Sequence, residues 1–278
     1  MLLGLPWSGS AHAKDIWTTP EWEKREKLAA CEWLVTCTAA NRDHLALLAP
    51  EGKVELVYHG LDFKRFPPPP QRRSTRDGRN PTDPVTILSV GRLVEKKGMD
   101  VLLEALARLP SSLHWQFVHV GGGPLLDTLR QQADRLGLTA RITWRGALSQ
   151  EELLPEYRAA DIFALACRIA RDGDRDGLPN VLVEAQSQGL PCVATMVSAI
   201  PELIRDGVNG LLAAPDSPAD FARALESCIT DPARRDAMGA AGRMRVAAEF
   251  DLDDNLDQLA AKFGLATTTV APQRVAAG

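Results

Sequence analysis

Three basic residues share one short loop of the sequence, Gly91-Arg92-Leu93-Val94-Glu95-Lys96-Lys97-Gly98. Arg92 follows the apolar run 85–90, and Lys97 precedes an amphipathic stretch that begins at Met99. A guanidinium can hold a phosphate with two hydrogen bonds, an ammonium can hold it as a point charge, and the free N–H groups of a helix start add to both. The loop is therefore a candidate diphosphate site. The alternative is a solvated basic loop, and spacing alone does not separate the two.

A second loop combines acidic residues, glycines and the start of a predicted helix. It begins at Arg171 and ends in Pro179, which suits the first turn of a helix. Asp176 lies in this loop, and Glu184 lies about one turn inside the helix. A carboxylate there can accept hydrogen bonds from the two hydroxyls of a ribose, while the first N–H groups of the helix face an anion. The alternative is a solvated acidic surface.

Glycines directly follow another apolar run, in Val120-Gly121-Gly122-Gly123-Pro124. They permit close approach of a ligand or of another part of the chain, or they form only a tight turn. The string does not match G-x-G-x-x-G, so a dinucleotide site is poorly supported. A fourth polar turn, which contains Gly146, follows Trp144.

The elements that must position these loops alternate between short apolar runs and helical stretches. Residues Met99, Leu102, Leu103 and Leu106 follow helical spacing, which Leu109 extends, and Leu126, Leu129, Ala133 and Leu136 form a similar stripe. Buried strands joined by helices predict a doubly wound parallel α/β sheet, in which ligands bind at the carboxyl ends of the strands. The predicted strands are Val85–Val90, Trp115–Val120, Arg141–Trp144, Asp161–Ala166, Cys192–Thr195 and Gly210–Ala213.

Compositional changes divide the chain into five parts. Residues 85–250 form one complete Rossmann-like domain, and residues 1–66 form a partial one. The partial domain has strands predicted at Trp33–Cys37 and Val54–Tyr58 and helices at Glu21–Ala30 and Ala39–Leu48. We expect the chain to be N-terminally incomplete, because so small a parallel sheet leaves an edge and a face uncovered. The other parts are an exposed linker at 67–84, a C-terminal helix at 251–265 and a flexible tail at 266–278.

Composition argues against several classes of protein. A net charge of -4 is unlike the basic surplus of a general nucleic-acid binder. The five cysteines are scattered and suit a reducing compartment, and the five histidines show no metal-ligand spacing. No run approaches the roughly 18 apolar residues of a membrane span. Ala11-His12-Ala13 has the form of a signal cleavage site, but without a basic region before it a strand near the start is the preferred interpretation.

Three strings of the chain resemble motifs of the retaining GT-B glycosyltransferases of family 4: SVGRLVEKKG (89–98), GLPNVLVEA (177–185) and IPELIRDGVNGLL (200–212). The resemblance covers roughly residues 5–260 and keeps the motifs in order. The loop GDRDGLPN is similar to that of members that build bacterial exopolysaccharides. The resemblance implies an α/β fold of GT-B type, with a complete Rossmann-like donor domain at 85–250 and a partial acceptor domain at 1–66.

The resemblance also implies roles for single residues. Arg92 and Lys97 would hold the donor diphosphate, Glu184 would bind the ribose, and His12 would lie near the reacting sugar. Asp176 stands where the family usually has a glutamate, and its shorter side chain withdraws the carboxylate from the sugar. His59 is expected to be structural, in the hinge that leaves the first domain. The other implied donor-binding residues are Gly91, Gly146, Gly177, Leu178, Pro179, Asn180, Val181 and Leu182, with backbone N–H groups of Val181 and Leu182 facing the phosphate.

The expected reaction moves a hexosyl group from a nucleoside diphosphate sugar to an acceptor hydroxyl with retention, in polysaccharide or glycolipid synthesis. No metal or cofactor is expected, because Arg92, Lys97 and the helix start near Asn180 can stabilise the leaving diphosphate. The expected partners are the nucleotide-sugar donor and a sugar or lipid-linked sugar acceptor, without nucleic acid. The expected location is the cytoplasm, with peripheral contact at the inner membrane if the acceptor is a lipid.

Three other functions stay open. The chain could be a non-catalytic nucleotide-sugar-binding remnant, or one half of a split enzyme completed by a missing N-terminal polypeptide. A sugar-nucleotide epimerase of the same fold would need acid and base groups, for which the loop offers only Asp174 and Asp176. An NAD-dependent oxidoreductase is disfavoured because the glycine pattern is absent.

Overall fold

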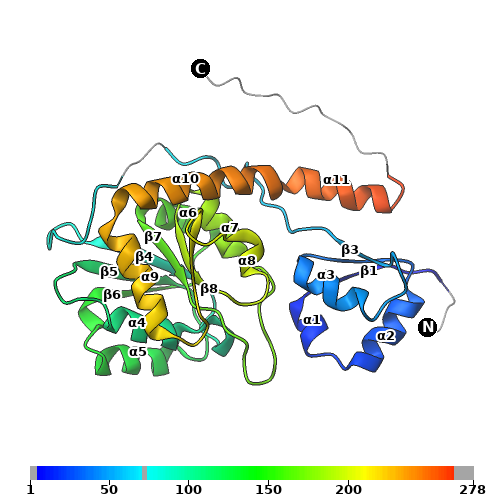
Figure 1. The fold of residues 1–278 in the computed structure, drawn as a ribbon, viewed down its shortest axis with the longest axis horizontal. Helices are drawn as coiled ribbons and strands as arrows, with labels where there is room; N and C mark the ends of the chain where they lie inside the picture. The colour runs from blue at the N-terminus through cyan, green and yellow to red at the C-terminus, as the bar shows by residue number, and fades with distance from the viewer. Residues whose placement is uncertain (1–4, 71–73, 266–278) are drawn as a thin grey trace, which may run out of the picture.

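The computed structural model describes residues 5–70 and 74–265 of the chain (Figure 1). The tail expected at 266–278 lies outside these residues. Two units are visible, a larger one built on a six-stranded sheet and a smaller N-terminal one built on three strands. Both sheets are parallel. The fold is therefore α/β with two Rossmann-like sheets, as the sequence predicted.

The larger sheet has the strand order β6-β5-β4-β7-β8-β9. Its first strand in sequence lies in the middle, so the winding of the chain reverses between β4 and β7. In sheets of this kind, the point of reversal is where ligands bind, beyond the carboxyl ends of the two central strands. The strands are β4 (Val85–Val90), β5 (Trp115–Val120), β6 (Ile142–Gly146), β7 (Ile162–Leu165), β8 (Cys192–Thr195) and β9 (Gly210–Ala213).

Four of the six predicted strands have the observed bounds, and two differ at their ends. Strand β6 begins after Arg141, because that residue closes a 3-10 turn, η2 (Thr139–Arg141). Strand β7 lacks both end residues of the predicted run, Asp161 and Ala166. The Asp161 carboxylate accepts hydrogen bonds from the Thr86 N–H and the Arg76 guanidinium, at 2.8 and 2.9 Å.

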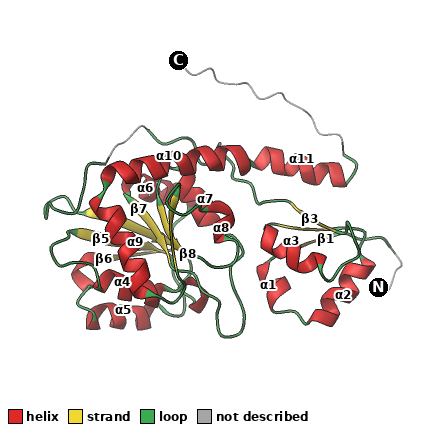
Figure 2. Cartoon of the chain, viewed as in Figure 1, coloured by secondary structure: helices red, strands yellow, loops and turns green. Residues whose placement is uncertain are grey.

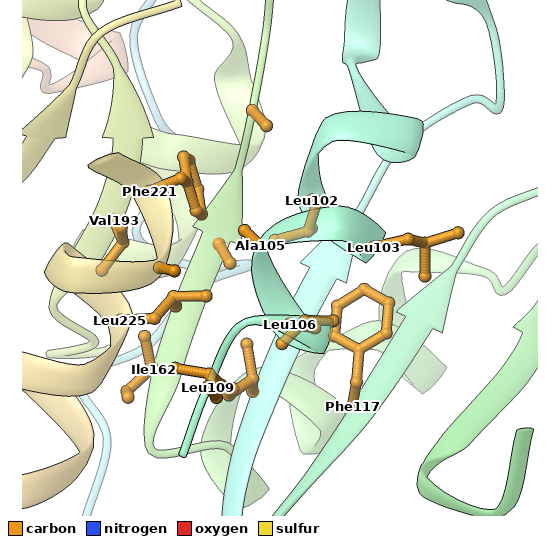
Figure 3. Packing of buried hydrophobic residues seen from close by; sticks show 14 of the residues in the cluster. Leu102, Leu103, Ala105, Leu106, Leu109, Phe117, Ile162, Val193, Phe221 and Leu225 are labelled. Carbon is orange, nitrogen blue, oxygen red and sulfur yellow. The ribbon is translucent and has the colours of Figure 1, made fainter. Parts of the chain in front are cut away.

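Helices cover both faces of this sheet, and each face has its own apolar core. On one face α4, α5 and α9 pack on the strands. Figure 3 shows Leu102 and Leu106 of α4 between Phe117 of β5 and Phe221 of α9. On the other face Tyr157 of α6 and the apolar sides of α7, α8 and α10 are buried. The helices are α4 (Met99–Ala107), α5 (Leu126–Arg135), α6 (Gln150–Ala159), α7 (Asn180–Ser187), α8 (Ile200–Leu203), α9 (Pro218–Thr230) and α10 (Pro232–Glu249).

Helix α4 ends two residues earlier than its apolar stripe predicts. Leu109 is buried and belongs to the same core, but its N–H bonds the Leu106 carbonyl in a tight turn. Pro110 follows, and the residue before a proline is disfavoured in helical conformation. The buried apolar residues therefore continue past the end of the helix, and their spacing predicted that end two residues too late.

The N-terminal unit packs three helices on a short sheet (Figure 2). Its core contains Ile16, Leu28, Leu34 and Leu45. Helix α2 has the predicted bounds, while both predicted strands and α3 are shorter than expected. The elements are β1 (Gly9–Ala11), α1 (Ala13–Trp17), α2 (Glu21–Ala30), β2 (Leu34–Thr36), α3 (Ala39–Ala46) and β3 (Val54–Leu56).

The chain crosses between the units twice, and the two crossings pair with each other. Leu61 and Asp251 form a parallel bridge, in which the Leu61 N–H donates to the Phe250 carbonyl at 2.7 Å. Helix α11 (Leu252–Lys262) then runs back along the N-terminal unit (Figure 1). At its end Lys262 pairs with Glu55, and the Phe263 ring packs edge-on against Trp33. The C-terminal helix thus ties the last described segment to the first unit.

Residues 67–84 form no helix or strand in the part that the structure describes. They nevertheless pack on the larger unit in places. The Arg76 guanidinium pairs with Asp161 and Asp83, and the Gly78 carbonyl accepts a hydrogen bond from the His114 N–H at 2.7 Å. Among the described residues, no helix is both long and apolar enough to cross a membrane.

Candidate functional site

The loop after β4 and the loop after β7 lie against each other at the carboxyl ends of the two central strands. Gly98 has a φ of 59°, and a Cβ there would lie 1.9 Å from the Ala166 carbonyl oxygen. The Lys96 carbonyl accepts a hydrogen bond from the Arg168 N–H at 2.9 Å. Glycine is therefore needed at position 98, because only glycine combines this conformation with so close an approach. The contact brings the basic loop and the acidic loop to one place.

A four-membered charge cluster joins these two loops. The Lys97 Nζ lies 2.6 Å from Asp176 Oδ2, and the Lys96 Nζ lies 3.4 Å from Asp176 Oδ1 and 3.1 Å from Asp174. The side chains of Lys97 and Asp176 are only 12% and 18% exposed. Burial alone would raise the pKa of Asp176, but the charges and hydrogen bonds of Lys97 and Lys96 outweigh it and hold the pKa below its usual value. Asp176 is therefore an ionised partner of both lysines.

The neighbouring Arg92 is exposed at the same strand end. No ion pair or hydrogen bond of its guanidinium is found within residues 5–70 and 74–265. The stem of Lys97 lies against Gly91, where an added Cβ would come within 3.5 Å of the Lys97 Cε. Arg92 therefore offers an uncommitted positive charge beside a lysine that already has a carboxylate partner.

The start of α7 needs two corrections to the sequence-based expectation. Pro179 is the residue before the helix, and Asn180 is the first helical residue. The Leu182 N–H already donates to the Pro179 carbonyl at 3.0 Å, so it is not available to a phosphate. Val181 keeps its place as a donor, since its N–H has no backbone acceptor among the described residues. The physical reason is that the chain turns tightly at Pro179, so that the carbonyl of this residue accepts a hydrogen bond from one of the first N–H groups of the helix.

Glu184 lies one turn farther along α7 and is held by one neighbour. The Tyr157 hydroxyl donates to its Oε2 at 2.8 Å. Burial raises the pKa of Glu184, and this hydrogen bond only partly opposes it. Glu184 lines a pocket of about 210 Å³ together with Asn180, His59 and Gln150. A half-buried carboxylate that faces a small polar pocket can accept hydrogen bonds from a ligand's hydroxyls.

Gly177 and Leu178 connect the acidic loop with the N-terminal unit and the core. A Cβ on Gly177 would lie 3.3 Å from the Thr38 side chain and 3.7 Å from Ala13, both in the N-terminal unit. Leu178 packs against the core beneath α7. Gly177 therefore lies at the boundary between the units, and Leu178 anchors the loop to the larger unit.

The three glycines after β5 serve the packing of loops. The Gly121 N–H donates to the Gly146 carbonyl at 2.7 Å, and a Cβ on Gly121 would lie 1.9 Å from the Gly91 carbonyl oxygen. Gly123 makes a similar approach to the backbone of Leu93. The close approach that the glycines predicted is therefore made by the loop after β4.

His12 lies between the carboxyl end of β1 and the first residue of α1. Its Nδ1 lies 3.7 Å from the Cys37 Sγ, and its ring centroid lies 5.1 Å from that of His59. His59 also forms a side-chain hydrogen bond with Asn180. Burial and the charge of His12 lower the pKa of His59, and the bond to Asn180 only partly opposes them. The expected hinge residue thus contacts two expected site residues, which the sequence did not indicate.

Glu202 joins the two units and was also missed by the sequence. Its carboxylate accepts hydrogen bonds from the N–H groups of Ala39 and Ala40 at the start of α3, both at 2.8 Å. The Tyr58 hydroxyl donates to the same carboxylate at 3.0 Å. Burial and the nearby Glu202 raise the pKa of Tyr58 to about 12, so the hydroxyl keeps its proton. The string that contains Glu202 resembled a family motif, but it did not indicate a partner 163 residues away in the sequence.

Comparisons with known proteins agree on one family. The model of the glycosyl transferases group 1 matches residues 71–245. A GDP-mannose-dependent alpha-(1-6)-phosphatidylinositol monomannoside mannosyltransferase of Mycobacterium tuberculosis is 35% identical over 77% of this chain and 55% of its own length. A D-inositol 3-phosphate glycosyltransferase of Thermobifida fusca is 34% identical over 77% of this chain and 50% of its own length. The chain thus spans about half the length of the curated relatives it matches.

Solved structures support the fold. A crystal structure of Anabaena Alr3699/HepE in complex with UDP has a TM-score of 0.79 at 21% identity, over 93% of this chain and 72% of that one. A sucrose-phosphate synthase from Thermosynechococcus elongatus has a TM-score of 0.75 at 23% identity, over 88% of this chain and 60% of that one. The fold is therefore of the GT-B type that the motifs implied, and the chain belongs to the glycosyl transferases group 1.

Proposed function

We propose that this chain binds a nucleoside diphosphate sugar and transfers its hexosyl group to an acceptor hydroxyl with retention of configuration. The observation that carries the proposal is the contact between Lys97 and Asp176, at 2.6 Å, between the basic and acidic loops. It supports a shared site for the diphosphate and the sugar at the point where the winding of the sheet reverses. The names of the curated relatives, which are glycosyltransferases, support the same activity.

Charge separation is the difficult step of such a transfer, because negative charge grows on the leaving diphosphate. In this proposal Arg92 and Lys97 stabilise that charge, and the Val181 N–H at the start of α7 adds to them. Asp176 holds Lys97 in place and faces the sugar, and Glu184 binds the ribose hydroxyls. His12 lies near the reacting sugar, at the edge of the N-terminal unit. Protein cations supply the stabilisation in this scheme, which makes the proposed reaction independent of metal.

The acceptor that we propose is a sugar or a lipid-linked sugar, in polysaccharide or glycolipid synthesis. The mannosyltransferase relative is named for a phosphatidylinositol monomannoside and for GDP-mannose, and the HepE crystals contain UDP. These names differ in nucleotide, so the base and sugar of the donor have to be measured. A lipid-linked acceptor would place the protein at the cytoplasmic surface of the inner membrane.

Calorimetric titration tests donor binding with GDP-mannose, UDP-glucose and ADP-glucose as a panel. We expect one donor to bind at least tenfold more tightly than the others, and we expect Glu184→Gln to weaken that binding. A transfer assay with the preferred donor and a panel of glycolipid acceptors follows. A folded protein that binds no member of the panel at millimolar concentration contradicts the proposal. Binding without transfer would instead support a nucleotide-sugar-binding role.

A further inference from the structure

Three side chains that can ligate a metal ion meet near the boundary between the units. They are His12, Cys37 and His59, and one ligating atom of each lies within 4.8 Å of the others. Their positions in the sequence show no metal motif, because they come from the ends of β1 and β2 and from the segment after β3. The fold alone brings them together.

Two of the three are fixed by the small parallel sheet. Ala11 of β1 pairs with Thr36 of β2, so the next residues, His12 and Cys37, leave neighbouring strands side by side. The Thr36 hydroxyl donates to the Ala11 carbonyl at 2.8 Å and strengthens this register. Cys37 is buried, while both imidazoles reach solvent. An ion can therefore enter from the solvent side, and the thiol forms the floor of the site.

The distance between these two ligands suits a tetrahedral metal ion. The His12 Nδ1 and the Cys37 Sγ are 3.7 Å apart. In a tetrahedral zinc site with Zn–N of about 2.1 Å and Zn–S of about 2.3 Å, the nitrogen and the sulfur are about 3.6 Å apart. The pair already has the required separation. Imidazole and thiolate are ligands that Zn²⁺ favours and that Mg²⁺ and Ca²⁺ do not.

Contacts outside the cluster orient the two rings. The Ser10 hydroxyl lies 3.3 Å from the His12 Nε2, which leaves the Nδ1 directed at Cys37. His59 is held by its side-chain hydrogen bond with Asn180. Metal-ligating histidines commonly have the second ring nitrogen hydrogen-bonded to a neighbour, as the His12 Nε2 is here to Ser10. The nearby carboxylate of Glu202 is already engaged by Ala39, Ala40 and Tyr58, so the fourth position is left to water.

We propose that His12, Cys37 and His59 bind one Zn²⁺ ion, with water as the fourth ligand. Binding releases the thiol proton of Cys37 to solvent, and no electron is transferred. The ion does not take part in catalysis. The ion binds His12, the side chain that the proposed function places near the reacting sugar, and Zn²⁺ therefore inhibits transfer. This inhibition rests on the proposed function.

Titration of metal-free protein with Co²⁺ tests the site without any activity measurement. We expect one Co²⁺ per chain, a thiolate-to-cobalt absorption band in the near ultraviolet and the visible bands of tetrahedral Co²⁺, all removed by one equivalent of Zn²⁺. Cys37→Ser should abolish the thiolate band, and His59→Gln should weaken Co²⁺ binding at least tenfold. His44→Gln is the matched control: it removes a histidine of the same unit that contacts Lys24 and Trp17, and it should keep the full spectrum.

The inference is overturned if folded wild-type protein gives no thiolate band, or if the band persists in Cys37→Ser. If circular dichroism shows that Cys37→Ser does not fold, the Co²⁺ affinity of His59→Gln decides instead, because the His59 side chain is exposed to solvent and its replacement should leave the fold intact. Transfer assays separate the two proposals. We expect equimolar Zn²⁺ to reduce transfer at least tenfold in the wild type, reversibly with a chelator, and to have little effect in Cys37→Ser. A cobalt spectrum without any transfer refutes the proposed function and leaves the metal site standing.

Discussion

Removal of the Lys97 ammonium tests the central element of the proposed site. The exposed fraction of this side chain is 12%, and its Nζ lies 2.6 Å from Asp176. At an effective dielectric constant of about 20, a unit charge about 4 Å from another contributes about 4 kcal/mol. Part of that energy is already present in the ligand-free protein, because Lys97 is paired with Asp176. We therefore expect Lys97→Ala to raise the transition-state barrier by about 2–3 kcal/mol, which corresponds to about 30- to 160-fold in kcat/KM.

The fold should survive this substitution. Asp176 keeps Lys96 as a partner at 3.4 Å, so no buried carboxylate loses its last cation. The assay is steady-state transfer from the preferred nucleotide sugar, with thermal unfolding and donor calorimetry alongside. Arg171→Ala is a matched control, because its side chain is 96% exposed in the same loop region and it should leave kcat/KM within about twofold. A folded Lys97→Ala protein with kcat/KM within threefold of the wild type would refute the assigned role.

Three further changes test the structure around the site. Burial raises the pKa of Glu184, so its ionised form destabilises the native state at neutral pH. Glu184→Gln should therefore raise the melting temperature at pH 7–8, with the gain vanishing below about pH 4, while donor binding is weakened. In a denaturant titration, Gly98→Ala should lower the free energy of unfolding by about 3 kcal/mol or more, because the new Cβ would lie 1.9 Å from the Ala166 carbonyl oxygen. Gly137→Ala is the control: Gly137 has a φ of 69° and no atom within 4 Å of an added Cβ, so the loss should be only about 1 kcal/mol. Glu202→Gln should speed amide hydrogen exchange at the start of α3 at least tenfold, and unchanged exchange would show that its carboxylate does not hold the units together.

The sequence predicted the larger sheet well because most of its strands are short, mainly apolar runs between polar loops. Strand β4, for example, is buried along its whole length, so its pattern had one interpretation. Ends were less well predicted, because they depend on local hydrogen bonds. The turn at Leu109 and the bonds of Asp161 are of this kind, and neither changes the apolar pattern.

The sequence predicted the loops of the candidate site, but it did not predict the contacts between their side chains. Spacing singled out Lys97 and Asp176 separately, and their pairing follows only from the adjacency of β4 and β7. Tyr157, which holds Glu184, carried no signal, because a tyrosine on an apolar helix face is ordinary core material. The contact between His12 and Cys37 could not be predicted for a different reason, because strand register brings together residues that are 25 positions apart in the sequence.

The paired crossings at Leu61 and Asp251 limit how the two units can move. A single tether would let them swivel freely, but here two adjacent backbone segments are hydrogen-bonded to each other, and twisting would shear those bonds. The joint is crowded as well, because a Cβ on Gly60 would lie 2.2 Å from the Leu252 Cα. Rotation of one unit against the other would therefore strain both the hydrogen bonds and the close packing at this joint. The hydrogen bonds of the Glu202 carboxylate to the start of α3 add a further connection between the units, away from the two crossings.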